Sequence, residues 1–284
     1  MAAKPAAAKK GAATPVVPNS VSLMEAGKGS TRVKTRLIVL YGGPKVQKTG
    51  SCSTIKGAKW IVSDPNTIPT LDALDRLPPD KDIYEVTSLK ETRAVILKML
   101  EVCEKNGPEA LGCTAVIKDS ATQLVDWHQQ DVARETNQRF MGDVKNNNGW
   151  QQFNAEFSAF IDDLGLLSKY ITVIVICHAK EKMDLSKGDW AGLNLPPQMA
   201  LKMGRTANWV LYQSKRSYTA GEKDKPDEYV RLSEPDQNGV RKAVEVVIHT
   251  ETNGLWLAAA NGRNLKAEEP GDMAALLRKE GLLE

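Results

Sequence analysis

The 284-residue chain has no apolar stretch long enough to cross a membrane as a helix. Its longest apolar run, residues 171–177 (ITVIVIC), has the length of a strand, whereas a membrane helix needs about 20 residues. The N-terminus carries lysines but lacks the apolar core, about 7–15 residues long, of a secretory signal. We therefore expect a protein of the cytoplasm that has no membrane partner.

Cysteine and histidine are also scarce, with four and three residues respectively. No two cysteines form a C-x-x-C pair, and the histidines stand far from any cysteine cluster, so the spacing does not predict a zinc site. A chain of this size does not depend on a disulfide framework. We expect reduced, partly buried thiols at Cys52, Cys103, Cys113 and Cys177.

Charge is unevenly distributed along the chain. The net charge is +3, yet the first 36 residues hold seven Lys or Arg residues against one Glu, which leaves the remainder slightly acidic. Residues 1–35 are rich in Ala, Lys and Pro near their start and show no periodicity, which predicts a disordered basic leader. Such a leader suits contact with nucleic acid, and it equally suits a solubilising tail.

Beyond the leader, segments of strand type alternate with helical patterns. Strands are expected at 37–41, 59–63, 114–118, 171–177, 209–213, 229–233, 243–250 and 255–258. A capping box of Ser88 and Glu91 opens a helix that Gly107 ends. Helical spacing from Trp150 to Leu164 predicts a core-packing stripe, and residues 272–280 predict a short helix.

This order of elements predicts an α/β fold. Its central sheet is mainly parallel, with helices on both faces and an antiparallel C-terminal extension. The central run 171–177 is apolar on both faces, as parallel strands covered by helices are. We expect one main domain over residues 36–265 and a C-terminal tail with a short helix over 266–284.

One loop carries recognisable chemistry. The segment after the first strand nearly matches the phosphate-binding pattern G-x-x-x-x-G-K-[ST], whose backbone N–H groups surround phosphates. Lys48 is placed to reach the β- and γ-phosphates, and the Thr49 hydroxyl to hold Mg²⁺. The candidate residues for binding ATP are Gly42, Gly43, Pro44, Lys45, Val46, Gln47, Lys48, Thr49 and Gly50.

Gln47 departs from the pattern, which has glycine at this position. A side chain there crowds the phosphates or strains the turn. The context supports the motif nevertheless, because a later strand ends in Asp119, where such proteins place the aspartate that holds Mg²⁺. Lys118, beside it, is unusual for a buried strand. The alternative is a chance turn of Gly and Lys residues.

The loop and its context resemble the phage-encoded, RecA-like P-loop ATPases of single-strand annealing and recombination. The resemblance covers about residues 35–265 and rests on the loop, on the segment VIKDS ending at Ser120, on a strand ending at His178, and on Arg263 in a late A-N-G-R. It implies a RecA-like P-loop NTPase fold, ATP and Mg²⁺ as ligands, and a homo-oligomer. The location would then be the cytoplasm of the host cell.

The resemblance also implies catalytic roles, residue by residue. Lys48 and Asp119 act on phosphates and metal, and Asp64 stands where these enzymes place the acid that activates water. The alternative for Asp64 is a turn cap before Pro65. His178 stands at the position of a γ-phosphate sensor, with a core histidine as the alternative. Arg263 is placed as an arginine finger across a subunit boundary, or as a solvated surface arginine.

The family's mobile loops after the third and fourth core strands face DNA. In this sequence those loops hold basic residues and one tryptophan, which suit phosphate contact and base stacking. Exposed charge is also ordinary solvated surface. The candidate DNA-binding residues are Arg134, Arg139, Lys145, Lys180, Lys182, Lys187 and Trp190.

Two functions follow as hypotheses. The first is an ATPase that acts on single-stranded DNA in recombination, annealing or replication, with a single-strand binding protein as a further partner. The second is a degenerate P-loop scaffold that binds nucleotide weakly and does not turn it over, which Gln47 favours. A helicase or packaging motor is less favoured, because the chain shows no second motor or nuclease domain.

Overall fold

The sheet of this computed structural model is built around β1 (Leu37–Gly42), whose residues are all buried. The structure describes residues 35–141, 148–184, 188–219, 230–232, 242–253, 256, 258–260, 262 and 264–283. The disorder expected for the leader therefore lies outside the described residues. On one side of β1 lie parallel strands in the order β5 (Val173–Asp184), β4 (Val116–Asp119), β2 (Lys59–Val62) and β3 (Ile83–Glu85).

On the other side of β1 the sheet becomes antiparallel after its first strand. Strand β7 (Trp209–Thr219) is parallel to β1, and β9 (Lys242–His249) and β11 (Glu268–Pro270) follow it in antiparallel pairing. Three short strands join at the margins, namely β6 (Gly188–Leu193) on β5, β8 (Val230–Leu232) on β9 and β10 (Ala259–Ala260) on β7. The predicted fold class, a mainly parallel sheet with an antiparallel C-terminal extension, is confirmed.

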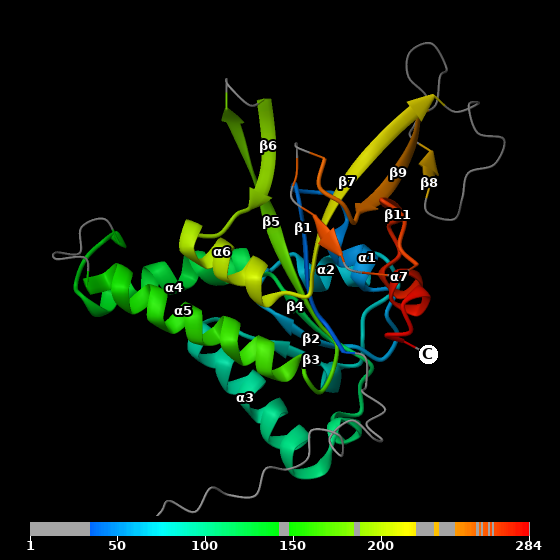
Figure 1. Cartoon of the computed structure of the whole chain (residues 1–284). Helices are drawn as coiled ribbons and strands as arrows, with labels where there is room; N and C mark the ends of the chain where they lie inside the picture. Colours follow the sequence, from blue (N-terminus) through cyan, green and yellow to red (C-terminus); the bar gives the residue numbers. More distant parts are fainter. Residues whose placement is uncertain are drawn as a thin grey trace, which may run out of the picture. The chain divides into compact units, whose positions relative to one another are not determined.

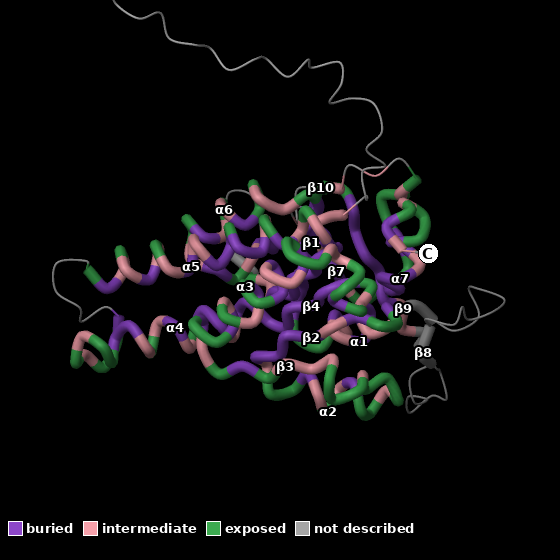
Figure 2. The backbone as a smooth tube through the Cα atoms, turned by 90° about the horizontal axis from the view of Figure 1, so that it is seen from below, coloured by how far each residue is buried: buried purple, intermediate pink, exposed green. Residues whose placement is uncertain are grey.

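Helices cover both faces of the sheet, as the apolar central strands require. One face packs against α3 (Leu89–Asn106), α4 (Ala121–Glu135), α5 (Asn148–Leu167) and α6 (Pro197–Thr206), and the other against α1 (Lys48–Cys52), α2 (Thr67–Asp72) and α7 (Met273–Lys279). Figure 1 shows α3, α4 and α5 together on one side and α1 and α7 on the other. In Figure 2 the buried positions follow the strands and the inner helix faces. Two short 3-10 helices, Asp80–Asp82 and Pro108–Leu111, complete the element order.

Local signals account for several of these elements. The Ser88 hydroxyl accepts the backbone N–H of Glu91 at 3.1 Å, and Gly107 follows α3 with a φ of 84°. The predicted capping box and helix end are thus confirmed, and the Glu91 carboxylate also accepts the backbone N–H of Thr87 at 2.7 Å. The predicted stripe on α5 packs in the core, with Phe153 and Phe157 fully buried.

Other elements lack a strong sequence signal. The predicted strand 255–258 is displaced, since β10 lies at Ala259–Ala260 and residues 255 and 257 are outside the described part. The short helix predicted over residues 272–280 is confirmed as α7, whose Met273 and Leu277 are buried against the sheet and α1, whereas β11, in the same segment, was not predicted. The described residues belong to one compact unit, Lys34–Glu284.

A lysine lies in the middle of this core. Lys118 on β4 is fully buried, and its ammonium group donates to the Ser63 hydroxyl and, at 3.5 Å, to the carbonyl of Ile61. Removal from water disfavours the charged form, so burial lowers the pKa of Lys118 to about 7. The unfolded chain, with an ordinary lysine pKa, binds more protons than the folded protein from about pH 7 to about pH 10.

We predict that Lys118→Met flattens the pH dependence of stability above pH 7. In the wild type, the free energy of unfolding should rise with pH in this window by as much as about 1.4 kcal/mol per pH unit. Methionine has a similar length and does not titrate, so the variant loses this rise. Urea unfolding between about pH 7 and pH 9 measures it. Exposed Lys90→Met is the control, and equal slopes for Lys118→Met and wild type would contradict the prediction.

Candidate functional site

The loop that joins β1 to α1 lies where the sheet changes direction. The chain leaves β1 toward β2 on one side, and β7 fills the other side later in the sequence. In open α/β sheets, ligands bind at the carboxyl ends of the strands at such a point. Lys45 and Gln47 of this loop have positive φ angles of 58° and 67°. Gln47, the N-cap of α1, therefore holds the left-handed conformation that glycine adopts without strain.

Lys48 closes the loop from inside. Its ammonium group donates to the carbonyl oxygens of Gly42 at 3.0 Å and Gly43 at 2.8 Å, and the side chain is buried. Burial lowers the pKa of Lys48, whereas the nearby carboxylate of Asp119 opposes the shift. The Lys48 ammonium group thus contacts the loop from its inner side. The oxygens of an anionic ligand can replace the two carbonyl oxygens as acceptors.

Asp119, at the end of β4, is the buried acid of the site. Its Oδ2 accepts the hydroxyl of Thr49 at 2.7 Å and that of Thr67 at 2.9 Å. Burial raises the pKa of Asp119, and the two hydroxyls act against that shift. Thr67, on the first turn of α2, was not among the predicted site residues. A threonine two residues before Pro69 is typical of the start of a helix and does not by itself indicate a binding site.

The arrangement of Thr49 and Asp119 fits a magnesium ion. The Thr49 hydroxyl directs its proton at Asp119, which leaves its oxygen lone pairs available to a cation. Mg²⁺ characteristically binds through one or two protein oxygens together with substrate phosphates and water. Among the described residues there is no cluster of three or more His, Cys, Asp or Glu side chains that could hold a metal without such a substrate.

Asp64 and His178 face one another at the same edge. The Asp64 Oδ2 lies 3.7 Å from the His178 Nε2, and Asp64 Oδ1 accepts the backbone N–H of Asn66 at 2.9 Å. Interaction with the His178 ring lowers the pKa of Asp64 to about 2. Asp64 is therefore ionised at neutral pH. Asp64 therefore fulfils both predictions. Its Oδ1 caps the turn at Asn66, and its Oδ2 faces His178.

The strand ends that carry these acids are fixed to one another. The backbone N–H of Ser63 donates to the Asp119 carbonyl at 2.6 Å, and the Ser63 hydroxyl donates to the Ser120 carbonyl at 2.8 Å. The buried Lys118 donates to that same hydroxyl. This network was missed from the sequence, although a lysine within an otherwise apolar strand was its visible signal.

Gln213 on β7 supports the loop from the other side. It is fully buried, and its Nε2 donates to the carbonyl of Val46 at 2.6 Å. A Cβ atom at Gly42 would lie 2.3 Å from the Gln213 carbonyl oxygen, so only glycine fits there. The sequence showed Gln213 only as the polar end of an apolar strand.

Several predicted site residues lie elsewhere or outside the described part. Arg263, Lys145 and Lys187 are outside the described residues. Lys180 and Lys182 lie on β5 and Trp190 on β6, where Lys182 pairs with Trp190, although the structure does not describe the side chains of these two. The prediction that these three residues lie in a loop is wrong, because β5 continues past His178 and β6 pairs with it in antiparallel direction.

The prediction for the other DNA-facing loop is wrong for Arg134. Arg134 lies in the last turn of α4, where it is 3.6 Å from Asp131, rather than in a loop. Arg139 follows the helix, and its guanidinium lies 5.2 Å from the centre of the Phe140 ring. The Ser120 hydroxyl accepts the Gln123 N–H and starts α4, a cap that the sequence analysis did not use.

The cysteines match the prediction of free thiols. All four are free, three of them are buried and Cys113 is partly buried. Burial raises the pKa of Cys177 to about 12, so this thiol stays protonated beside the site. A search of the described residues found no helix with the length and apolar character needed to cross a bilayer.

The fold, the loop and the paired Thr49 and Asp119 define a P-loop nucleotide-binding ATPase domain. The chain belongs to the AAA domain family, whose model matches residues 34–254. No curated protein matches the chain. Among solved structures, the flagellar accessory protein FlaH from Methanocaldococcus jannaschii is similar over 75% of this chain and 76% of its own, at 10% identity and a TM-score of 0.35.

We predict that Gln47→Gly raises ATP affinity or turnover. A left-handed backbone costs a residue other than glycine about 1–2 kcal/mol, and glycine also removes a side chain from the position where the phosphate-binding pattern has none. Calorimetric ATP titration and steady-state hydrolysis, run on both proteins in parallel, measure the effect.

The matched control for this substitution is Asn137→Gly. Asn137 also has a positive φ, of 54°, but follows α4 away from the loop. It should leave ATP affinity and turnover unchanged. If Gln47→Gly improves neither quantity, Gln47 does not limit the site.

Proposed function

We propose that this protein binds ATP with Mg²⁺, hydrolyses it, and uses the cycle to control its hold on single-stranded DNA. The observation that carries the proposal is the convergence of Lys48, Thr49, Asp119, Asp64 and His178 at the carboxyl edge of one parallel sheet. Phosphoryl transfer depends chiefly on positioning and electrostatic stabilisation, and this group supplies both cationic and acidic side chains at one edge.

Each residue has a role in this proposal. Lys48 exchanges the carbonyls of Gly42 and Gly43 for phosphate oxygens, and its charge offsets theirs. Thr49 and Asp119 hold the magnesium ion, which when bound neutralises charge on the phosphates. Asp64, with a pKa of about 2, is a weak base, so it orients the attacking water as a hydrogen-bond acceptor. His178 would keep that carboxylate in place and would donate to a γ-phosphate oxygen once nucleotide is bound.

The DNA role rests on charge and on the family resemblance. Lys180, Arg134 and Arg139 are exposed cations. Lys182 and Trp190 occupy paired positions on the β5–β6 arm, which is the antiparallel pair formed by residues 179–184 of β5 and 188–193 of β6. Phosphate contact and base stacking are the usual means of holding single strands. The proposed setting is phage recombination, annealing or replication, with the protein acting as a homo-oligomer beside a single-strand binding protein. Arg263 would then complete a neighbouring subunit's site.

A scaffold without turnover is the second candidate. The strained left-handed Gln47 and the Lys48 ammonium bound to two loop carbonyls favour it, because both must be overcome for tight nucleotide binding. ATP turnover with and without single-stranded DNA separates the two. DNA-stimulated turnover supports the ATPase, whereas tight DNA binding without turnover supports the scaffold.

We predict that Lys48→Ala weakens Mg-ATP binding at least tenfold, about 1.4 kcal/mol. The variant removes the cation that faces the phosphates. Calorimetry with a slowly hydrolysed ATP analogue measures the dissociation constant. Exposed Lys56→Ala, which removes a lysine just after α1, is the control. An unchanged dissociation constant in Lys48→Ala would refute the assignment of the loop.

We predict that binding to single-stranded DNA is ionic and tolerant of sequence. The affinity should fall by about 0.7 log units per phosphate contact for each tenfold rise in salt. Fluorescence anisotropy of labelled oligonucleotides over a range of salt gives this slope. Removal of residues 1–34 should make the slope shallower if the basic leader touches DNA. An affinity independent of salt would rule out the proposed mode.

A further inference from the structure

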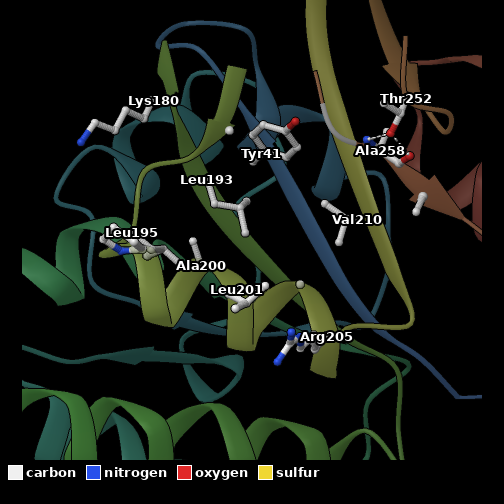
Figure 3. Close-up of a pocket in the computed structure, with 14 residues that line it drawn as sticks. Tyr41, Lys180, Leu193, Leu195, Ala200, Leu201, Arg205, Val210, Thr252 and Ala258 are labelled. Carbon is white, nitrogen blue, oxygen red and sulfur yellow. Dashed lines mark hydrogen bonds between the residues drawn. The ribbon is translucent and has the colours of Figure 1, made fainter. Parts of the chain in front are cut away.

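A cavity of about 480 Å³ opens between β6, α6, β7 and the segment near β10, apart from the carboxyl-edge site. Its wall is mostly apolar and includes Leu193, Leu195, Leu201, Val210 and Ala258 (Figure 3). Leu201 is 55% exposed, so part of this wall is open to solvent. The volume is within the usual range of ligand pockets, roughly 300–1,000 Å³.

The hydroxyl groups on the cavity wall already have partners. The Tyr41 hydroxyl donates to the carbonyl of Ala191 at 3.2 Å, and the Thr252 hydroxyl donates to the carbonyl of Ala258 at 2.8 Å. A nucleobase placed here would leave its polar edges without matching groups, at a cost of about 1–3 kcal/mol for each unpaired group. The wall therefore suits apolar side chains better than bases.

Two cations flank this apolar wall. Lys180 on β5 and Arg205 on α6 are both exposed, and neither side chain has an ion pair or hydrogen bond with any residue that the structure describes. In Figure 3 Lys180 lies at the upper left of the lining group and Arg205 at its lower edge. An occupant with carboxylates on both sides of its apolar part would pair with both cations.

We propose that this cavity is the docking site for an acidic peptide segment of a partner protein, with apolar side chains as its anchors. The apolar wall takes the anchors, and Lys180 and Arg205 pair with carboxylates on either side. The chain's own basic leader, with a net charge of +6 over the first 36 residues, has the wrong sign for this site. The proposal does not depend on ATP turnover.

The probe is a fluorescein-labelled short peptide in which glutamates flank one leucine and one phenylalanine. Two matched peptides replace the glutamates by lysines, or the leucine and phenylalanine by serines. Anisotropy with the full-length protein, in the absence of nucleotide, should show binding of the first peptide and at least tenfold weaker binding of each matched peptide. Failure of the first peptide to bind at millimolar protein overturns the proposal.

Gly204 allows the cavity to be filled without disturbing the fold. It lies in α6 on the cavity wall, and a Cβ atom built there meets nothing within 4 Å. Leucine is also a better helix former than glycine. Gly204→Leu should weaken the peptide at least tenfold, and Gly204→Ala, which fills little space, should weaken it much less.

Charge reversal tests whether the cations beside the cavity pair with carboxylates of the peptide. Arg205→Glu should weaken the peptide at least tenfold, whereas Lys90→Glu on the exposed side of α3 should have no effect. Unchanged affinity in either Gly204→Leu or Arg205→Glu overturns the proposal. Nucleic acid is the alternative occupant. If a single-stranded oligonucleotide displaces the peptide, and if Gly204→Leu abolishes binding of that oligonucleotide, then nucleic acid occupies the cavity and the proposal is overturned.

Discussion

The carboxylate of Asp119 holds three segments together at the carboxyl edge of the sheet. It ends β4, and its two hydroxyl partners bring α1 through Thr49 and α2 through Thr67 to the same point. A buried carboxylate is costly unless it is hydrogen-bonded, so these contacts fix the acid and both helix starts at once. The loop, the acid Asp64 and the β5 strand end are all arranged around this group.

Buried cations balance that acid. Lys48 and Lys118 both lie close enough for Asp119 to favour their charged forms, while burial disfavours them. Each lysine nevertheless has hydrogen-bond partners, the loop carbonyls for Lys48 and Ser63 for Lys118. Added negative charge raises a nearby lysine pKa, so an anion at the loop would strengthen the charged form of Lys48. Binding of an anionic ligand and protonation of Lys48 are thus linked at this edge of the sheet.

The sequence predicted the parts whose signals are local. The apolar runs of β1 and β5 and the capping box at Ser88 were sufficient to locate the sheet centre and α3, and the glycine-rich loop located the site. Thr67, Ser63 and Gln213 escaped prediction because their roles arise only when distant strand ends meet. The strands of the β5–β6 arm could not be predicted from the sequence, because the charged residues between Ala179 and Leu193 do not show the alternation of apolar and polar residues that is typical of a strand.

The two strands that flank β1, β5 and β7, contribute to both the candidate site and the apolar cavity. At the last residue of β1, Gly42 pairs with His178 and Gln213, and both β5 and β7 then continue well past it. Within β1, Tyr41 faces the apolar cavity while the next residue, Gly42, begins the close approach to Gln213. Alternation along a strand thus places an apolar surface and a polar site one residue apart. Because all residues of β1 are buried and successive side chains point to opposite faces of the sheet, the two surfaces stay separate although they are adjacent in sequence.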